Sequence, residues 1–289
     1  MNVHRSNAHR SIVLAVTLAG SLSVAGMHAA CAQEAEAPPR QHWSFHGPFG
    51  TYDTAQLQRG FKIYREVCAT CHSLKLLAFR NLADPGGPEF SEAQAATIAS
   101  SFQVTDGPND KGEMFQRPGK LADHFPLPFP NDQAARAALG GGLPPDMSVL
   151  AKARGYEAGF PWFIFDAFTQ YQEDGPDYIH AILNGYEDPP PAGVTLAPGT
   201  QYNKYFPGDA IAMPKPLSDG QVEYTDGAPA TVEQYSKDIS AFLMWAAEPK
   251  LDERKRLGFQ VFVFLLVLTG LLYFTKRRVW HDVHHPAAG

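Results

Sequence analysis

Cysteine is scarce in this chain of 289 residues, which contains only three. No cysteine follows Cys71, so the second ligand pair that a structural zinc site of the paired-cysteine type requires does not exist. A thioredoxin-like thiol pair is disfavoured as well, because the sequence around Cys68 and Cys71 indicates a helix and then a loop, not a βαβ unit. A disulfide between these two residues would be short and strained.

An excess of positive charge is also missing, since the formal net charge is −6. Removal of a leader that holds two arginines and no acid would make it −8, which argues against nucleic-acid binding and favours a basic protein partner. Three acidic clusters are candidate docking points, although each can equally be a solvated loop. They are Asp106, Asp110 and Glu113; Glu173, Asp174 and Asp177; and Glu187 with Asp188.

Residues 1–32 have the pattern of a secretory signal peptide. Arg5 and Arg10 form a basic start, residues 12–24 are largely apolar, and Ala30-Cys31-Ala32 matches a cleavage site. A lipoprotein signal through Cys31 is disfavoured, because His28 stands where such signals have leucine. We therefore expect the mature chain to begin at Gln33 and to be exported.

The 18 residues 257–274 carry no formal charge and are flanked by three cations on each side. At about 1.5 Å per residue they would extend roughly 27 Å, close to the roughly 30 Å hydrocarbon core of a bilayer. The six flanking cations argue against a buried core helix. We expect a periplasmic domain over 33–249, a transmembrane anchor over 250–278 and a cytoplasmic tail over 279–289, in a single-pass protein of the bacterial inner membrane. His281, His284 and His285 are interpreted as part of a solvated tail rather than as a metal site.

The motif Cys68-Ala69-Thr70-Cys71-His72 predicts the chemistry of the chain. Two thiols at this spacing add across the two vinyl groups of haem, and the following imidazole ligates the iron. The sequence therefore predicts one covalently bound haem c, with Cys68, Cys71 and His72 as cofactor-binding residues. Export supports this prediction, because bacterial c-type haem is attached outside the cytoplasm.

Two amphipathic helices enclose the predicted domain. One begins at Asp53, with Gln56 three residues later, and places Leu57, Phe61 and Tyr64 on one face. The other begins at Thr231 and ends before Pro249. Between them the chain is rich in glycine and proline, so we expect a mainly α fold. That fold is a c-type cytochrome head with long Gly/Pro-rich loops and one C-terminal transmembrane helix. Gly60 either permits a close helix crossing or is there by chance.

A second axial ligand is expected for a pure electron carrier. Met213 lies in a proline-flanked loop far from Cys71 and is favoured, whereas Met244 is predicted to belong to the core. Thioether sulfur favours ferrous iron and raises the reduction potential. On spacing alone the other candidates stay open, namely Met114, Met147, His42, His46, His124 and His180.

From about Trp43 to the anchor the chain resembles the cytochrome c1 family, the haem-bearing subunit of the cytochrome bc1 complex (ubiquinol–cytochrome c reductase). Besides the haem motif, the resemblance rests on RGF at 59–61, DGPN at 106–109, GEMF at 112–115, RPGKL at 117–121, LPPD at 143–146 (LPPDM with Met147), YFPG at 205–208, IAM at 211–213, DGAPAT at 226–231 and WAAEP at 245–249. It implies that His72 and Met213 are the metal ligands and that Arg117 pairs with a haem propionate. Met147 is then expected to pack near the haem rather than to ligate it.

The resemblance also implies an electron relay. The haem accepts one electron from a Rieske iron–sulfur protein and passes it to a soluble c-type cytochrome, while quinol oxidation takes place in the cytochrome b subunit of a dimeric complex. The chain is then a redox subunit without bond chemistry of its own. One alternative is another membrane-tethered c-type cytochrome, which delivers electrons to a terminal oxidase or a photosynthetic reaction centre. A haem enzyme or gas sensor is the other, and it would need an open axial position.

Overall fold

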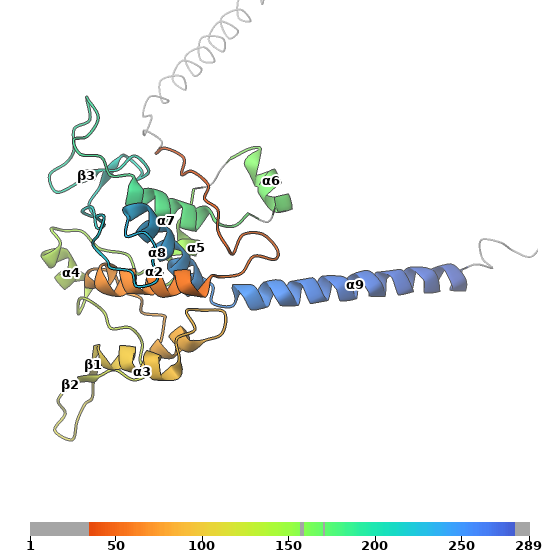
Figure 1. Cartoon of the computed structure of the whole chain (residues 1–289), viewed down its shortest axis with the longest axis horizontal. Helices are drawn as coiled ribbons and strands as arrows, with labels where there is room; N and C mark the ends of the chain where they lie inside the picture. The colour runs from red at the N-terminus through yellow and green to blue at the C-terminus, as the bar shows by residue number, and fades with distance from the viewer. Residues whose placement is uncertain (1–34, 157–158, 170, 281–289) are drawn as a thin grey trace, which may run out of the picture.

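The computed structural model describes residues 35–156, 159–169 and 171–280. A mainly helical head lies at one end, and the long helix α9 (Leu251–Val279) projects from it (Figure 1). This confirms the predicted fold class. The predicted signal peptide and the three histidines of the predicted tail lie outside the described residues.

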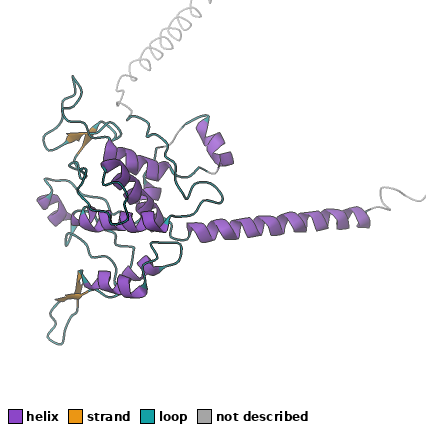
Figure 2. Cartoon of the chain, viewed as in Figure 1, coloured by secondary structure: helices purple, strands orange, loops and turns teal. Residues whose placement is uncertain are grey.

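Helices and loops make up most of the head, and its described residues form two small strand pairs (Figure 2). The helices are α2 (Thr54–Glu66), α3 (Glu92–Ser100), α4 (Asp132–Ala138), α5 (Leu150–Ala153), α6 (Trp162–Thr169), α7 (Asp174–Asn184) and α8 (Val232–Ala247), with 3-10 turns at Cys68–Thr70 and Phe79–Ala83. Strand β1 (Gln103–Asp106) pairs antiparallel with β2 (Phe115–Pro118), and β3 (Gln201–Tyr202) pairs antiparallel with β4 (Ala210–Ile211).

Both predicted amphipathic helices begin at the expected caps. The Asp53 carboxylate accepts a hydrogen bond from the Gln56 amide at 2.8 Å, and the Thr231 hydroxyl accepts one from the Gln234 amide at 3.3 Å. Such caps satisfy backbone donors that the first helical turn leaves unpaired and contribute about 1 kcal/mol each. The apolar faces of α2 and α8 then pack into the main core.

Helices α2 and α8 cross closely at Gly60. A Cβ atom at this position would lie 2.2 Å from the carbonyl oxygen of Asp238 and 2.6 Å from the Cβ of Phe242. Only a residue without a side chain allows this approach, so the close crossing explains the glycine. Tyr64 and Phe242 continue the contact, with ring centroids 6.1 Å apart.

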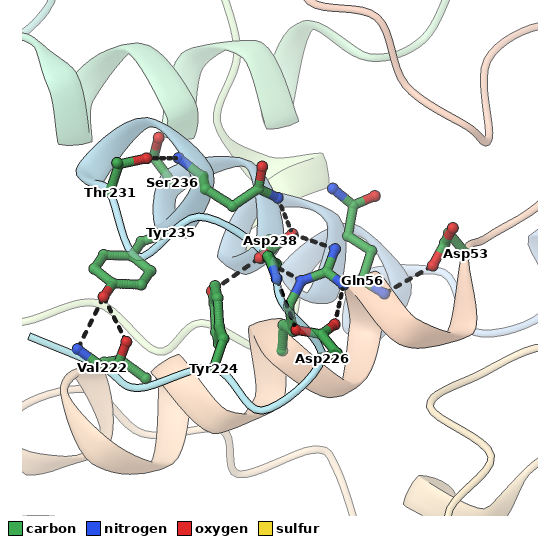
Figure 3. Close-up of polar contacts among 12 residues, drawn as sticks. Asp53, Gln56, Val222, Tyr224, Asp226, Thr231, Tyr235, Ser236 and Asp238 are labelled. Atoms are coloured by element: carbon green, nitrogen blue, oxygen red, sulfur yellow. Dashed lines mark hydrogen bonds and ion pairs between the residues drawn. The ribbon is translucent and has the colours of Figure 1, made fainter. Parts of the chain in front are cut away.

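A polar network joins the same two helices beside the crossing (Figure 3). Asp238 is fully buried, and its carboxylate accepts a hydrogen bond from Arg59 Nε at 2.8 Å and from the Tyr224 hydroxyl at 2.8 Å. Gln234 donates to the same carboxylate at 2.8 Å, and Arg59 also reaches Asp226 at 2.7 Å. The buried charge is therefore paired and hydrogen-bonded, as burial of an ion requires.

Helix α9 contains the predicted membrane span. Its apolar window has none of its residues buried in the head, and Phe262 and Phe264 are each 62% exposed. By length and composition the helix can cross a bilayer, which agrees with the expected single-pass anchor. The base of α9 is fixed to the head by the buried Leu251 and by Lys255, whose ammonium group donates to the carbonyl oxygens of Phe45 and Gly50.

Candidate cofactor site

The predicted attachment cysteines follow directly from the end of α2. Glu66 is the last residue of that helix, and Cys68–Thr70 forms a 3-10 turn. The amides of Cys71 and His72 both donate to the carbonyl oxygen of Cys68, at 3.1 and 2.9 Å. The backbone therefore folds the motif into one compact turn at the edge of the core.

Both thiols are free and partly buried, and Cys68 packs against the main hydrophobic cluster. Burial raises the pKa of the Cys68 thiol to about 12, with a smaller contribution from the neighbouring Cys71. The thiol is therefore protonated at neutral pH and retains the S–H bond that adds across a vinyl group.

The ring of His72 is oriented by the segment that begins at Pro145. Its Nδ1 lies 2.9 Å from the carbonyl oxygen of Pro145. A carbonyl oxygen can only accept, so Nδ1 carries the proton and Nε2 keeps a free lone pair, which is the tautomer that a metal-ligating histidine needs. Burial lowers the pKa of His72, against the opposing effect of this hydrogen bond, and so favours the neutral imidazole.

Asp146 clamps this segment to the residues that follow the motif. Its carboxylate accepts from the Ser73 hydroxyl at 2.6 Å and from the amides of Lys75 and Ser148 at 3.0 Å each. The amide of Met147 in turn donates to the carbonyl oxygen of Ser73 at 2.8 Å. These contacts hold the Pro145 carbonyl in place against His72.

Met213 lies two residues after β4 and packs against both hydrophobic clusters of the head. The larger of these clusters also receives Cys68, so Met213 and Cys68 both border the same apolar core. The Tyr186 hydroxyl donates to the Met213 carbonyl oxygen at 3.1 Å. A thioether side chain at the edge of an apolar core is compatible with a haem, whose faces are themselves apolar.

The other candidate ligands have different surroundings. Met244 is fully buried on α8, as predicted for a core residue, and Met147 is buried in the same cluster. Met114 is 61% exposed. Among the histidines, His42 and His124 are exposed, His46 contacts Glu173, and His180 is 4% exposed beside Glu233.

Arg117 has partners that the sequence analysis missed. On β2 it pairs with Asp106 at the end of β1 and makes two contacts with Asp123, at 2.6 and 2.9 Å, while Nη1 also donates to the Pro118 carbonyl oxygen at 3.1 Å. Four of the five guanidinium N–H groups are thereby used, and one on Nη2 remains. Hydrogen bonding from Arg117 lowers the pKa of Asp123 to about 2.

The acidic clusters differ in exposure. Glu173 and Asp177 are 2% and 3% exposed, and Asp177 accepts hydrogen bonds from the indole N–H of Trp43 at 2.8 Å and from the Gln41 amide at 2.9 Å. Their carboxylates bind the N-terminal segment, so Glu173 and Asp177 are neither solvated nor available to a docking partner, whereas Asp174 is half-buried. Asp110 and Glu113, in contrast, are exposed in the loop between β1 and β2.

Comparison with known proteins matches residues 43–283 to the sequence model of the Cytochrome C1 family. The chain is 61% identical over 275 residues to a cytochrome b/c1 of Bradyrhizobium diazoefficiens, a match that covers 95% of this chain and 40% of that relative's length. It is 52% identical over 250 residues to cytochrome c1 of Blastochloris viridis, covering 86% and 88%. A mitochondrial cytochrome c1 heme protein of Arabidopsis thaliana is 46% identical over 255 residues, covering 87% and 76%.

Proposed function

The chain belongs to the cytochrome c1 family, and on this premise we propose that it is the haem-bearing electron-transfer subunit of a cytochrome bc1 complex. It accepts one electron from a Rieske iron–sulfur protein and passes it to a soluble c-type cytochrome. Quinol oxidation takes place in the cytochrome b subunit of the same complex, which is dimeric. The chain itself makes and breaks no substrate bonds.

The observation that carries this proposal is the compact turn at Cys68–His72, directly after the end of α2. Cys68 and Cys71 are free thiols, and the 2.9 Å contact with Pro145 leaves Nε2 of His72 available. In the proposal the two cysteines would hold haem c through thioethers, and His72 would ligate its iron. When bound, the haem supplies an iron that alternates between the ferric and ferrous states and so carries a single electron.

Met213 and Arg117 are proposed to set the reduction potential. The Met213 sulfur would be the second protein ligand of the haem iron, and as a soft thioether it would favour the ferrous state. Arg117 would donate its remaining N–H to a haem propionate and so fix the position of that negative charge relative to the iron. Asp106 and Asp123 keep its guanidinium in one orientation for this role.

The head is proposed to face the periplasm, with residues 279–289 in the cytoplasm. Support comes from the predicted signal peptide at 1–32 together with the single candidate span in the described part of the chain. Protease treatment of spheroplasts checks this orientation. We expect digestion of the head in intact spheroplasts, and protection of the head would contradict the assignment.

Purification of the full-length chain from its own membranes tests the electron-transfer role. We expect a haem that resists acidic acetone extraction, a pyridine haemochrome spectrum of haem c, and copurification of a b-type cytochrome with a 2Fe–2S protein. Copurification with a terminal oxidase or a reaction centre instead would support another membrane-tethered cytochrome. Tight carbon monoxide binding by the reduced protein would indicate an open axial position and a haem enzyme or sensor.

A further inference from the structure

Helix α6 (Trp162–Thr169) exposes all five of its large apolar side chains, and none of its residues is buried. Phe163 is 61% exposed and Phe168 is 84% exposed, and Phe160 just before the helix is 81% exposed. Trp162, Ile164 and Phe165 are exposed as well. A contiguous apolar surface of this kind is uncommon on a head that faces only water, and it marks a contact with a partner or a membrane.

The one charged side chain of α6 is directed away from this surface. Asp166 pairs with Arg40 of the N-terminal segment at 2.7 Å, and its side chain is only 16% exposed. The Arg40 guanidinium also lies over the rings of Trp162 at 5.4 Å and Tyr171 at 4.1 Å. The exposed side of α6 therefore carries aromatic and aliphatic groups without a formal charge.

The position of α6 relative to α9 indicates which surface α6 contacts. Helix α6 projects from the head on the side from which α9 leaves it (Figure 1). Because Leu251 and Lys255 fix the base of α9 to the head, and the uncharged run begins at residue 257, the bilayer surface must lie directly against this side. Phe49, which is 72% exposed, contacts Phe259 of α9 with ring centroids 5.5 Å apart and adds an aromatic group there.

The length and composition of α6 indicate whether the helix spans the bilayer or lies at its interface. Eight residues extend about 12 Å, far less than the roughly 30 Å of a hydrocarbon core, so the helix cannot span the bilayer. Tryptophan and phenylalanine are suited to the boundary between headgroups and acyl chains. We propose that α6 is an interfacial anchor whose aromatic side chains enter the same bilayer leaflet from which α9 emerges.

A second contact with the membrane would restrict the tilt and rotation of the head. The base of α9 alone is one attachment point, whereas α9 and α6 together define how the head sits on the bilayer. This inference needs only the membrane span and is independent of the proposed electron-transfer role.

Site-directed spin labelling of the full-length protein, purified with whatever subunits accompany it and placed in lipid nanodiscs, tests the proposal. Single cysteines replace Phe163 or Phe168 in α6, with Leu266→Cys in α9 as the lipid reference and Phe115→Cys on β2 as the water-exposed reference. Power saturation compares the accessibility of each nitroxide to oxygen, which concentrates in lipid, and to the water-soluble complex NiEDDA. The unsubstituted chain, taken through the same labelling, gives the background.

We expect both α6 labels to favour oxygen over NiEDDA, as the Leu266→Cys label does, and the Phe115→Cys label to show the reverse order. Greater accessibility to NiEDDA than to oxygen at both α6 positions, as at the water-exposed reference, would overturn the proposal. Low accessibility to both reagents would overturn it as well, because it would mean that a protein subunit covers α6. The haem absorbance and far-UV circular dichroism of each variant, compared with the parent, establish that the two α6 substitutions leave the fold intact.

Discussion

The Nδ1 atom of His72 lies 2.9 Å from the carbonyl oxygen of Pro145, which is 73 residues further along the chain. This contact fixes the tautomer and the orientation of the ring, and a donated hydrogen bond from Nδ1 makes the imidazole a more basic ligand. The carbonyl is itself held by the contacts of Asp146 with Ser73 and Lys75. The potential of the proposed haem therefore depends on residues that do not touch it.

Replacement of Asp146 by alanine tests this dependence. The variant loses the hydrogen bonds from Ser73 and Lys75 to the Asp146 carboxylate, which hold the Pro145 carbonyl in place. The hydrogen bond from His72 to this carbonyl then weakens, and the imidazole becomes less basic. Because a less basic ligand stabilises ferric iron less, we expect the haem to stay attached and its midpoint potential to rise. Redox titration measures the shift, and Asp110→Ala in the exposed β1–β2 loop is the control. An unchanged potential in the Asp146 variant would contradict the argument.

Met213→Leu is expected to move the potential in the opposite direction. The haem remains attached through its thioethers, but the soft sulfur ligand that favours ferrous iron is lost. The midpoint potential should fall by a measurable part of the roughly 0.8 V range that axial ligands control. The reduced variant should also bind carbon monoxide. Met114→Leu, at an exposed position, serves as the matched control and should change neither property. A titration with the same midpoint as the parent would remove Met213 from the ligand set.

The close crossing of α2 and α8 predicts that Gly60→Ala is strongly destabilising. Its new methyl group would lie 2.2 Å from a backbone oxygen, so the helices must separate. Overpacking of this kind costs about 1–3 kcal/mol or more. Urea unfolding followed by circular dichroism measures the loss. Gly159→Ala is the control, because a Cβ there meets no atom within 4 Å. Equal midpoints for the two variants would show that the crossing tolerates a side chain.

Asp238 and Asp226 should differ sharply in their contribution to stability. Asp238→Ala leaves Arg59 without its buried partner, and breaking a buried ion pair in this way costs about 3–5 kcal/mol. Asp226, whose side chain is 42% exposed, contacts the same arginine from the surface, and its replacement should cost at most about 1 kcal/mol. Denaturant unfolding measures the loss in the free energy of unfolding for each alanine variant. Similar losses in the two variants would contradict the burial of the Asp238–Arg59 pair.

The raised pKa of Asp174 predicts that the stability of the folded head depends on pH. Burial raises its pKa from 3.8 to about 6, with further contributions from the neighbouring carboxylates of Asp166, Asp177 and Glu173 against the lowering effect of Arg40. The folded chain thus binds this proton more tightly than the unfolded chain. Its stabilising contribution is complete below about pH 4 and is lost as the pH rises through about 6.

Asp174→Asn should therefore raise the thermal unfolding temperature at pH 7.5, and the difference from the parent should shrink towards pH 4.5. Asp110→Asn controls for the loss of one negative charge from the head. A difference between Asp174→Asn and the parent that is the same at both pH values would show that the carboxyl does not titrate in this range.

The local features of this fold could be predicted from the sequence. The caps at Asp53 and Thr231 and the uncharged run at 257–274 depend on residues close together in the chain, and the structure places helices at each. Contacts over long separations could not be predicted. The pairing of Arg59 with Asp238 joins residues 179 positions apart, and no local pattern identifies either partner.

The same distinction between local and long-range features applies to the candidate site. Its attachment turn is a contiguous motif, whereas the Pro145 carbonyl is a backbone group with no sequence signal of its own. Arg117 stands opposite Val104 in the register of β1 and β2, so Asp106 reaches it diagonally across the strand pair, and Asp123 reaches it from the loop after β2. Helix α6 was missed because an apolar stretch of this length is usually buried, and only the packing of the head shows that its side chains face outwards.

Rapid mixing of the purified complex with a quinol, followed at the absorbance of haem c, tests the central claim most directly. We predict that the haem is reduced in the parent and is reoxidised when an oxidised soluble c-type cytochrome is added. In Met213→Leu, with its haem still attached, reduction should be blocked. A haem c that stays oxidised in the parent while the b-type haem accepts electrons normally would contradict the proposed relay.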